Sequence, residues 1–207
     1  MEQSTGTIQS YPLYVLTKEL AEKFIDQISY LLAQIPQVII TKDEILAGKK
    51  GERVLYGKWD LSLIVMQENK VIAVLIVYER KGENNVQYPF HTLYLSDLAV
   101  HPDYQRHGIG KALLEYVIDS TKSKGLKYLE GEPNISIQTN KAEFNSYVQH
   151  FYESLGFVKR AEKIYEDRID NIYGLTFTTS KCEVKQLSNR NENVIHQTIS
   201  KLNNSYS

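Results

Sequence analysis

The sequence has little that would tie it to a secreted, nucleic-acid-binding or membrane-bound class of protein. Its 207 residues contain one cysteine, Cys182, which excludes an internal disulfide and fits the reducing cytoplasm. The 24 basic residues nearly cancel the 25 acidic ones, so neither nucleic acid nor an anionic membrane is expected as a partner. The first basic residue is Lys18, and no apolar stretch follows a basic start, so we expect no secretory signal.

Long hydrophobic runs are also missing. The longest one with its flanking tyrosine, VIAVLIVY at 71–78, is far shorter than the ~20 residues of a membrane-spanning helix and is predicted to be a buried strand. His91, His101 and His150 stand at no metal-ligand spacing from cysteine or aspartate, so no metal is expected. With 42% apolar and 24% charged residues, the composition is that of an ordinary globular domain.

The length predicts one domain, residues 1–180, and a tail, residues 181–207, that is either disordered or a weak helix. Apolar periodicity predicts strands and helices in the domain. Strands are expected at 11–17, in a hairpin from 61 that turns at Glu68-Asn69-Lys70, and at 92–100, 126–131, 157–166 and 172–179. Helices are expected over 18–35, 41–48 and 144–155. A further helix follows the strand at 92–100 and ends near Gly125, whereas 132–143 is predicted to be a loop.

This order predicts a mixed α/β sheet with helices on both faces. Its one βαβ unit joins the strand at 92–100 to the strand at 126–131 through a helix. In such a unit a ligand binds outside the carboxyl ends of the strands, near the helix N-terminus.

A glycine-rich segment, HPDYQRHGIGKALLEYV at 101–117, stands at that place. The unpaired N–H groups of a first helical turn attract an anion, and Gly108 and Gly110 would let the backbone approach a phosphate. The glycines could instead simply turn the chain. The segment lacks the glycine and the Ser or Thr of a Walker loop, and Leu113 stands where a dinucleotide fingerprint needs glycine.

The segment does contain Gln-x-x-Gly-x-Gly, from Gln105 to Gly110, directly after a strand. Downstream, NSYVQHFYESLGF at 145–157 carries Asn145 and Tyr152. Together these motifs resemble those of the GCN5-related N-acetyltransferase (GNAT) superfamily. The resemblance covers about residues 11–180 and implies a mostly antiparallel sheet with a central splayed parallel strand pair.

The resemblance implies that acetyl-CoA is the co-substrate. Backbone amides of the 105–111 loop would bind its pyrophosphate, the strand ending at Val100 would bind the pantetheine arm, and Asn145 would hold that arm. Leu98 and Val100 could also serve only as core residues. The implied cofactor residues are Leu98, Ala99, Val100, Gln105, Arg106, His107, Gly108, Ile109, Gly110, Lys111, Asn145 and Tyr152.

Two residues are predicted to be catalytic. The family's tyrosine, here Tyr152, would protonate the departing thiolate, because a phenol with a pKa near ~10 is protonated at neutral pH. Tyr152 could instead only pack against Phe151. Asp97 is the candidate base, although it could equally accept loop N–H groups; Glu79 is a further candidate, and Tyr94 stands where some relatives carry glutamate.

The predicted reaction is direct attack of an amine on the thioester, because no cysteine or serine near the motifs has a partner base. The leading hypothesis for function is acetylation of a small cationic amine, which acidic residues on the acceptor side would favour. Two alternatives stay open: acetylation of a protein N-terminus or lysine, and an acetyl-CoA-binding regulatory module without turnover. A monomer or a homodimer is compatible with each. The acidic residues in question are Glu130, Glu132, Glu166, Asp167 and Asp170.

One departure from the family is expected beside the active site. Relatives reach the asparagine soon after the strand, whereas 14 residue steps separate Gly131 from Asn145. The intervening segment is interpreted as an insertion that forms a lid or substrate wall, or that displaces Asn145 from the cofactor.

Overall fold

The computed structural model describes residues 4–35, 40–82, 91–141 and 146–177. The chain divides into two units, Met1–Thr176 and Phe177–Ser207, and every described helix and strand lies in the first. The predicted tail, 181–207, lies outside the described residues. In chain order the elements are β1 (Gly6–Ile8), β2 (Tyr11–Val15), α1 (Lys18–Lys23), α2 (Ile25–Leu32), α3 (Lys42–Leu46), β3 (Lys49–Lys50), β4 (Arg53–Val54), α4 (Lys58–Leu61), β5 (Leu63–Gln67), β6 (Lys70–Arg80), β7 (Thr92–Val100), a 3-10 turn (Pro102–Tyr104), α5 (Ile109–Lys124), β8 (Asn134–Asn140), α6 (Ser146–Ser154), β9 (Val158–Ile164) and β10 (Ile169–Thr176).

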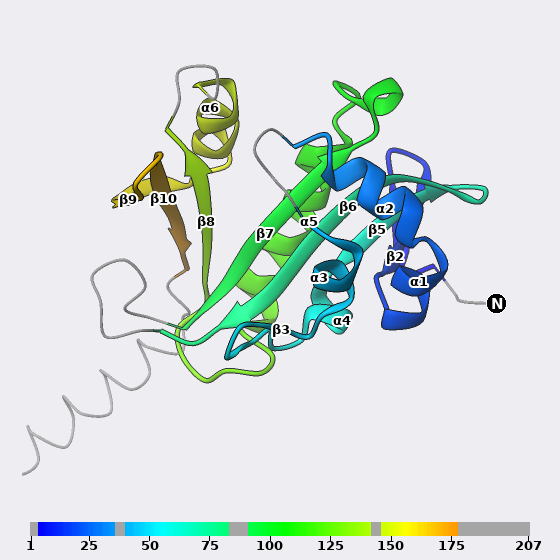
Figure 1. Ribbon diagram of the computed structural model, residues 1–207. Helices are drawn as coiled ribbons and strands as arrows, with labels where there is room; N and C mark the ends of the chain where they lie inside the picture. Colours follow the sequence, from blue (N-terminus) through cyan, green and yellow to red (C-terminus); the bar gives the residue numbers. More distant parts are fainter. Residues whose placement is uncertain (1–3, 36–39, 83–90, 142–145, 178–207) are drawn as a thin grey trace, which may run out of the picture. The chain divides into compact units, whose positions relative to one another are not determined.

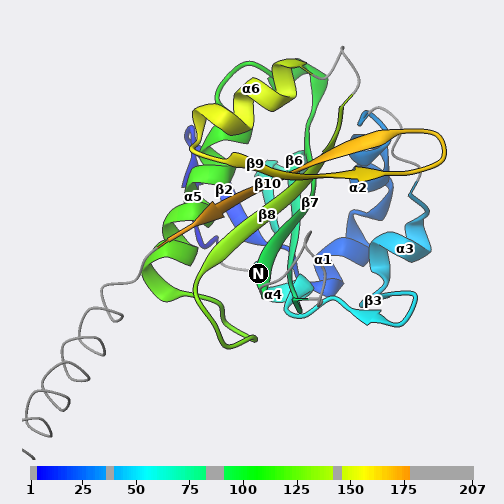
Figure 2. The same ribbon diagram turned by 90° about the vertical axis from the view of Figure 1, so that its left-hand side faces the viewer.

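An eight-stranded sheet of order β1-β2-β5-β6-β7-β8-β10-β9 forms the centre of the first unit. All neighbouring strands are antiparallel except β7 and β8, which are parallel. Helices α1, α2 and α3 cover one face of the sheet, and α5 and α6 cover the other (Figures 1 and 2). The predicted mixed sheet with a central parallel pair and helices on both faces is confirmed.

The side chains of β7 alternate between the two helical layers. Ala99 belongs to the core under α1 and α2, together with Leu20, Ile28 and Ile76. Leu98 and Val100 point the other way: a Cβ built on Gly110 of α5 would lie 3.7 Å from Leu98 Cδ2 and 3.6 Å from Val100 Cγ2. The strand that leads to the glycine-rich segment is therefore fixed on both faces.

A bulge at Ser96 separates β7 from β8. Leu95 pairs with Val77 of β6 and Asp97 with Ile76, so Ser96 is an extra residue in the ladder. Bulges bend a strand and increase its twist. Pairing with β8 stops at the same point, between Leu95 and Ile137. Past the bulge, the edge of β7 that faces away from β6 has no strand partner among the described residues.

The strand predicted at 126–131 is wrong, and so is the loop predicted at 132–143. Glu79 of β6 accepts hydrogen bonds from the backbone N–H groups of Lys127, Tyr128 and Leu129, so these amides are not available for a sheet. The strand is β8 instead, in which Ile135 and Ile137 are buried and the polar residues Asn134 and Ser136 are buried too.

The supposed insertion beside the active site therefore does not exist. Only five residue steps separate Asn140, the end of β8, from Asn145. The segment between the end of α5 and the start of β8 is held by Glu79 through the amides of residues 127–129.

Other local predictions are mostly confirmed. Thr17 caps α1 by accepting a hydrogen bond from the Leu20 N–H, α5 ends at Gly125, and Gly156 ends α6 with a φ of +88°. The helix predicted at 18–35 is two helices, because Phe24 leaves helical geometry between α1 and α2. The sequence did not predict β1, the β3–β4 hairpin or α4, and Pro36 lies outside the described residues.

We expect Glu79→Gln to lower the melting temperature by about 5 °C or more. An amide has one acceptor oxygen in place of two, so the N–H groups of residues 127–129, one of them buried and two partly buried, lose a charged partner, at about 2–3 kcal/mol. The measurement is thermal unfolding by circular dichroism. Glu130→Gln is the control, because Glu130 is exposed on the same connection and only its backbone carbonyl accepts a described hydrogen bond. Equal losses in the two variants would contradict this role of Glu79.

Candidate active site

The turn between β7 and α5 presents a row of backbone donors. Gly108 is the N-cap residue of α5 with a φ of +79°, and Arg106 also has a positive φ of +63°. None of the N–H groups from Arg106 to Lys111 donates a hydrogen bond to another residue in the described part of the chain. Alternating left-handed and right-handed residues turn successive N–H groups into a concave anion site. The turn can therefore bind a phosphate.

The rest of the turn keeps these donors in place. The Gln105 side chain donates a hydrogen bond of 3.0 Å to the Val100 carbonyl, which fastens the turn to the end of β7. Ile109 is buried and anchors the helix start. The side chains of Arg106 and His107 are exposed, and the Arg106 guanidinium is available as a counter-charge, while Lys111 pairs with Glu115 at 3.6 Å.

The side chains of Leu98–Val100 pack into the two layers of the core, as the sequence allowed. Their main chain lies on the edge of β7 that β8 leaves unpaired. A peptide-like arm could add to this open edge as a strand does.

Tyr152 lies buried on α6, with 6% of its surface exposed. Its ring contacts Phe151 at 5.3 Å and Phe157 at 5.8 Å between centroids. Burial raises the pKa of the Tyr152 hydroxyl, and the negative charge of Asp97 raises it further. The phenol is thus protonated at neutral pH and lies within electrostatic reach of Asp97. Asn145 lies outside the described residues.

Asp97 directly follows the bulge of β7. The Ser96 hydroxyl donates a hydrogen bond of 2.6 Å to its carboxylate. Burial raises the pKa of Asp97, while Ser96 and the cations Lys50 and Lys58 act in the opposite direction. A carboxylate with a raised pKa is a better proton acceptor than an exposed one.

Glu79, the other acid considered as a base, does not fit that role. It is 1% exposed, and its two oxygens are occupied by three backbone N–H groups. Tyr94, at the position where some relatives carry glutamate, contacts Tyr78 in a tilted arrangement with 5.4 Å between ring centroids, and the Arg80 guanidinium lies 5.7 Å from its ring.

One residue near the site gave no sequence signal. Lys58, 4% exposed, donates to the carbonyls of Ile45 at 2.6 Å and Ala47 at 2.7 Å, at the end of α3. Burial lowers the pKa of Lys58 to about 8, and the charge of Asp97 opposes that change. Lysine is common in every surface segment, so only the fold reveals that this one is buried and fastens α3 to α4.

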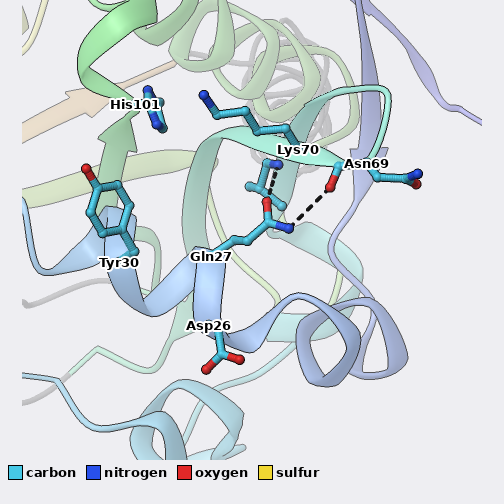
Figure 3. A pocket seen from close by; sticks show the side chains of 7 residues that line it. Asp26, Gln27, Tyr30, Asn69, Lys70 and His101 are labelled. Atoms are coloured by element: carbon cyan, nitrogen blue, oxygen red, sulfur yellow. Dashed lines mark hydrogen bonds between the residues drawn. The ribbon is translucent and has the colours of Figure 1, made fainter.

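Figure 3 shows a cavity of about 370 Å³ on the α2 side of the end of β7. Tyr30 and His101 face each other across it, 5.9 Å apart between ring centroids. Gln27 spans its floor, donating to the Asn69 carbonyl and accepting from the Val71 N–H. The cavity contains none of the predicted site residues. Among the described residues no group of three or more His, Cys, Asp or Glu side chains could hold a metal ion, and no described helix is long and apolar enough to cross a membrane.

Comparison with known proteins decides the family. Over residues 58–159 the chain matches the acetyltransferase (GNAT) domain family. The ribosomal protein bS18-alanine N-acetyltransferase of Escherichia coli K12 is 30% identical over 129 residues, which are 62% of this chain and 72% of that enzyme. The chain belongs to the GNAT acetyltransferase family. It is an acetyl-CoA-dependent N-acetyltransferase.

Solved GNAT structures share the fold. The ribosomal-protein-S18-alanine N-acetyltransferase of Escherichia coli superposes with a TM-score of 0.57 over 81% of this chain and 94% of that one, at 19% identity. Naa50 of Arabidopsis thaliana superposes with a TM-score of 0.57 over 81% and 99%, at 17% identity.

Proposed function

We propose that this GNAT acetyltransferase moves an acetyl group from acetyl-CoA to the N-terminal amine of a protein. The observation that carries this proposal is the match to the ribosomal protein bS18-alanine N-acetyltransferase. The match extends over 72% of that enzyme, so it covers most of a chain that acts on a protein amine. Proteins of the same fold include Naa50 solved with the bisubstrate analogue CoA-Ac-MVNAL and the NatC complex solved with a Gag peptide and CoA.

The co-substrate would lie along the turn and the open strand edge. Amides of residues 105–111 bind the diphosphate, and the main chain of Leu98–Val100 binds the arm that carries the thioester. Support for this comes from the unbonded N–H groups of the turn and from the parting of β7 and β8. Asn145, which follows β8 closely, is assigned to the same arm.

The transfer needs one proton acceptor and one proton donor. An α-amine has a pKa near ~8, so only about a tenth of it is neutral at pH 7. Asp97 takes a proton from the attacking nitrogen, directly or through water, as the C–N bond forms. The C–S bond then breaks, and Tyr152 gives its proton to the leaving sulfur. N–H groups at the strand edge polarise the carbonyl.

The acidic residues that would favour a small cationic acceptor do not behave as one group. Asp170 is 5% exposed and accepts hydrogen bonds from Gln138 and Arg168. Glu166 and Asp167 are exposed at the turn between β9 and β10. A polyamine is therefore kept as an alternative acceptor in the assay below.

The deciding assay follows thiol release from acetyl-CoA with three acceptors. One is a short peptide with a free N-terminus, one is the same peptide with a formylated N-terminus and an internal lysine, and one is spermidine. We expect only the first to accelerate release. If spermidine or the formylated peptide accelerates thiol release and the peptide with a free N-terminus does not, the proposal is contradicted. If none of the three acceptors raises the slow background rate, the result favours a regulatory acetyl-CoA-binding module.

The acid limb of the pH profile is expected to belong to Asp97. Only the carboxylate accepts a proton, so kcat at saturating peptide should fall as pH drops through the raised pKa of this group. Asp97→Asn should lower kcat by about 100-fold and remove that limb. The measurement is kcat between pH 5 and pH 9 for both proteins. A variant that keeps the limb would exclude Asp97 as the base.

A further inference from the structure

The first hairpin of the chain, β1–β2, closes with a tight turn. Ile8 pairs with Tyr11, so the loop consists of Gln9 and Ser10, whose φ values are +51° and +72°. Two-residue hairpin loops with positive φ at both positions follow the twist of the strands, and they favour asparagine and glycine. Backbone preference therefore does not explain the glutamine at position 9.

Contacts on both strands fix the position of this hairpin. Ile8 is buried, and the buried Leu13 pairs with Val65 of β5. The Tyr11 ring meets that of Tyr104, in the 3-10 turn after β7, edge to face with 5.9 Å between centroids. The hairpin is thus fastened to the segment that leads from β7 into the glycine-rich turn.

The Gln9 side chain reaches the N-cap residue of α5. A Cβ built on Gly108 would lie 3.2 Å from Gln9 Nε2 and 3.9 Å from Gln9 Cδ. A Cβ lies about 2.5 Å from the amide nitrogen of its own residue, so Nε2 lies within about 6 Å of the Gly108 nitrogen. Two hydrogen bonds of about 3 Å each cover that distance. A single oxygen atom can therefore accept from both groups.

The donors on the hairpin and on the turn have no protein partner within the described ranges. The Gln9 side chain is exposed, and none of the hydrogen bonds found in those ranges involves its carboxamide. The N–H groups from Arg106 to Lys111 are likewise unbonded there. Because Nε2 and the backbone amides are all donors, they cannot bond to one another. Their common partner is an anion with several acceptor oxygens, such as a phosphate.

Acidic side chains on the neighbouring segments are paired with cations. Asp103, in the 3-10 turn, lies 3.9 Å from the Lys70 ammonium, and Glu115 lies 3.6 Å from that of Lys111. Neither carboxylate leaves an unbalanced negative charge beside the turn. The exposed Arg106 adds a positive charge to the turn itself, so the surroundings favour an anion as well.

We propose that Gln9 is a further acetyl-CoA-binding residue, whose Nε2 donates a hydrogen bond to an oxygen of the same diphosphate that the turn amides bind. This rests on the placement of the diphosphate in the proposed function. Gln9 lies on a segment that carries none of the reacting groups. Its contribution therefore falls on the affinity for the coenzyme and not on the chemical step.

Titration calorimetry with CoA tests the proposal, because it needs no acceptor. We expect Gln9→Ala to weaken CoA binding about five- to tenfold, through the loss of one partly solvated hydrogen bond to a charged group. 3′-Dephospho-CoA keeps the diphosphate and lacks the 3′-phosphate, so its affinity should fall by the same factor. Ser10→Ala is the matched control, since it places alanine in the same turn, also at a positive φ, and it should bind both molecules as the parent does.

Gln9→Asn separates a hydrogen-bonding role from a structural one. Asparagine adopts positive φ more readily than glutamine, so this variant should unfold at the same temperature as the parent or a higher one. Its carboxamide is one methylene shorter and should no longer reach the diphosphate, so affinity should fall as in Gln9→Ala. Gln9→Glu places a negative charge there and should bind CoA more weakly than Gln9→Ala, by a factor that shrinks as salt is added.

The outcomes separate this role from the placement of the diphosphate. If Gly108→Val keeps its affinity for CoA, the diphosphate does not lie on the turn, and the role of Gln9 falls with it. If Gly108→Val binds weakly while Gln9→Ala and Gln9→Asn bind as tightly as the parent, the turn stands and Gln9 is excluded as a ligand. A loss confined to CoA, with 3′-dephospho-CoA unaffected, would move Gln9 to the 3′-phosphate and overturn the proposed contact.

Discussion

Tyr152→Phe is expected to lower kcat by a factor of about 100 to 10,000, the range for loss of a general acid. Without its hydroxyl, the side chain cannot protonate the departing thiolate, which must leave as an anion or find a proton in water. The aromatic ring remains in place between Phe151 and Phe157, so the packing of α6 on the sheet is preserved. The loss should therefore fall on kcat and leave the KM for acetyl-CoA within about a factor of two.

The measurement is steady-state thiol release, accompanied by thermal unfolding to confirm that the variant is folded. Tyr147→Phe removes an equivalent hydroxyl from the same helix at a side chain that is 76% exposed, and should leave kcat unchanged. The raised pKa of Tyr152 also predicts that no loss of the proton donor occurs up to pH 9. A Tyr152→Phe enzyme as fast as its parent would reduce Tyr152 to a packing residue.

Gly108→Val is expected to weaken acetyl-CoA binding by at least tenfold. A β-branched residue at a φ of +79° is strained, and a Cβ there would lie 3.2 Å from Gln9 Nε2. The turn can relieve the strain only by rotating its peptide groups, which moves the amides away from a common target. Each misdirected donor to a charged phosphate costs about 1.5–3 kcal/mol.

Titration calorimetry with CoA measures this effect directly. Gly125→Val provides a matched control, because Gly125 also has a left-handed φ, +74°, at the other end of the same helix, with nothing within 4 Å of an added Cβ. Both variants should lose thermal stability, whereas only Gly108→Val should lose affinity. Equal affinities in the two variants would remove the turn from the diphosphate site.

Predictions that rested on short-range patterns were accurate. The β7 strand has the predicted bounds, α5 begins at the glycine pair and ends at Gly125, and the hairpin of β5 and β6 turns at Glu68, whose φ is +54°. These features follow from backbone preferences within a few residues, such as capping and glycine's access to positive φ.

The errors arose where a distant group decided the local structure. Residues 126–131 have an apolar alternation, yet the Glu79 carboxylate, nearly 50 positions earlier, takes three of their amides. The segment cannot then form a ladder, and the next alternating stretch becomes β8. Similarly, nothing in the sequence around Asp97, one residue after the β7 bulge, or around Tyr152 on α6 indicates that the two side chains interact.

By itself, then, the sequence determined the strand, the glycine turn and the helix to which we assign the diphosphate, together with the family, because each depends on neighbouring residues. Only the tertiary structure decided which strand is parallel to β7, how Asp97 comes within electrostatic reach of Tyr152, and that Lys58 is buried against the end of α3. Those relations depend on pairings between residues far apart in the chain, and no local pattern of polarity or backbone preference encodes which pairings form.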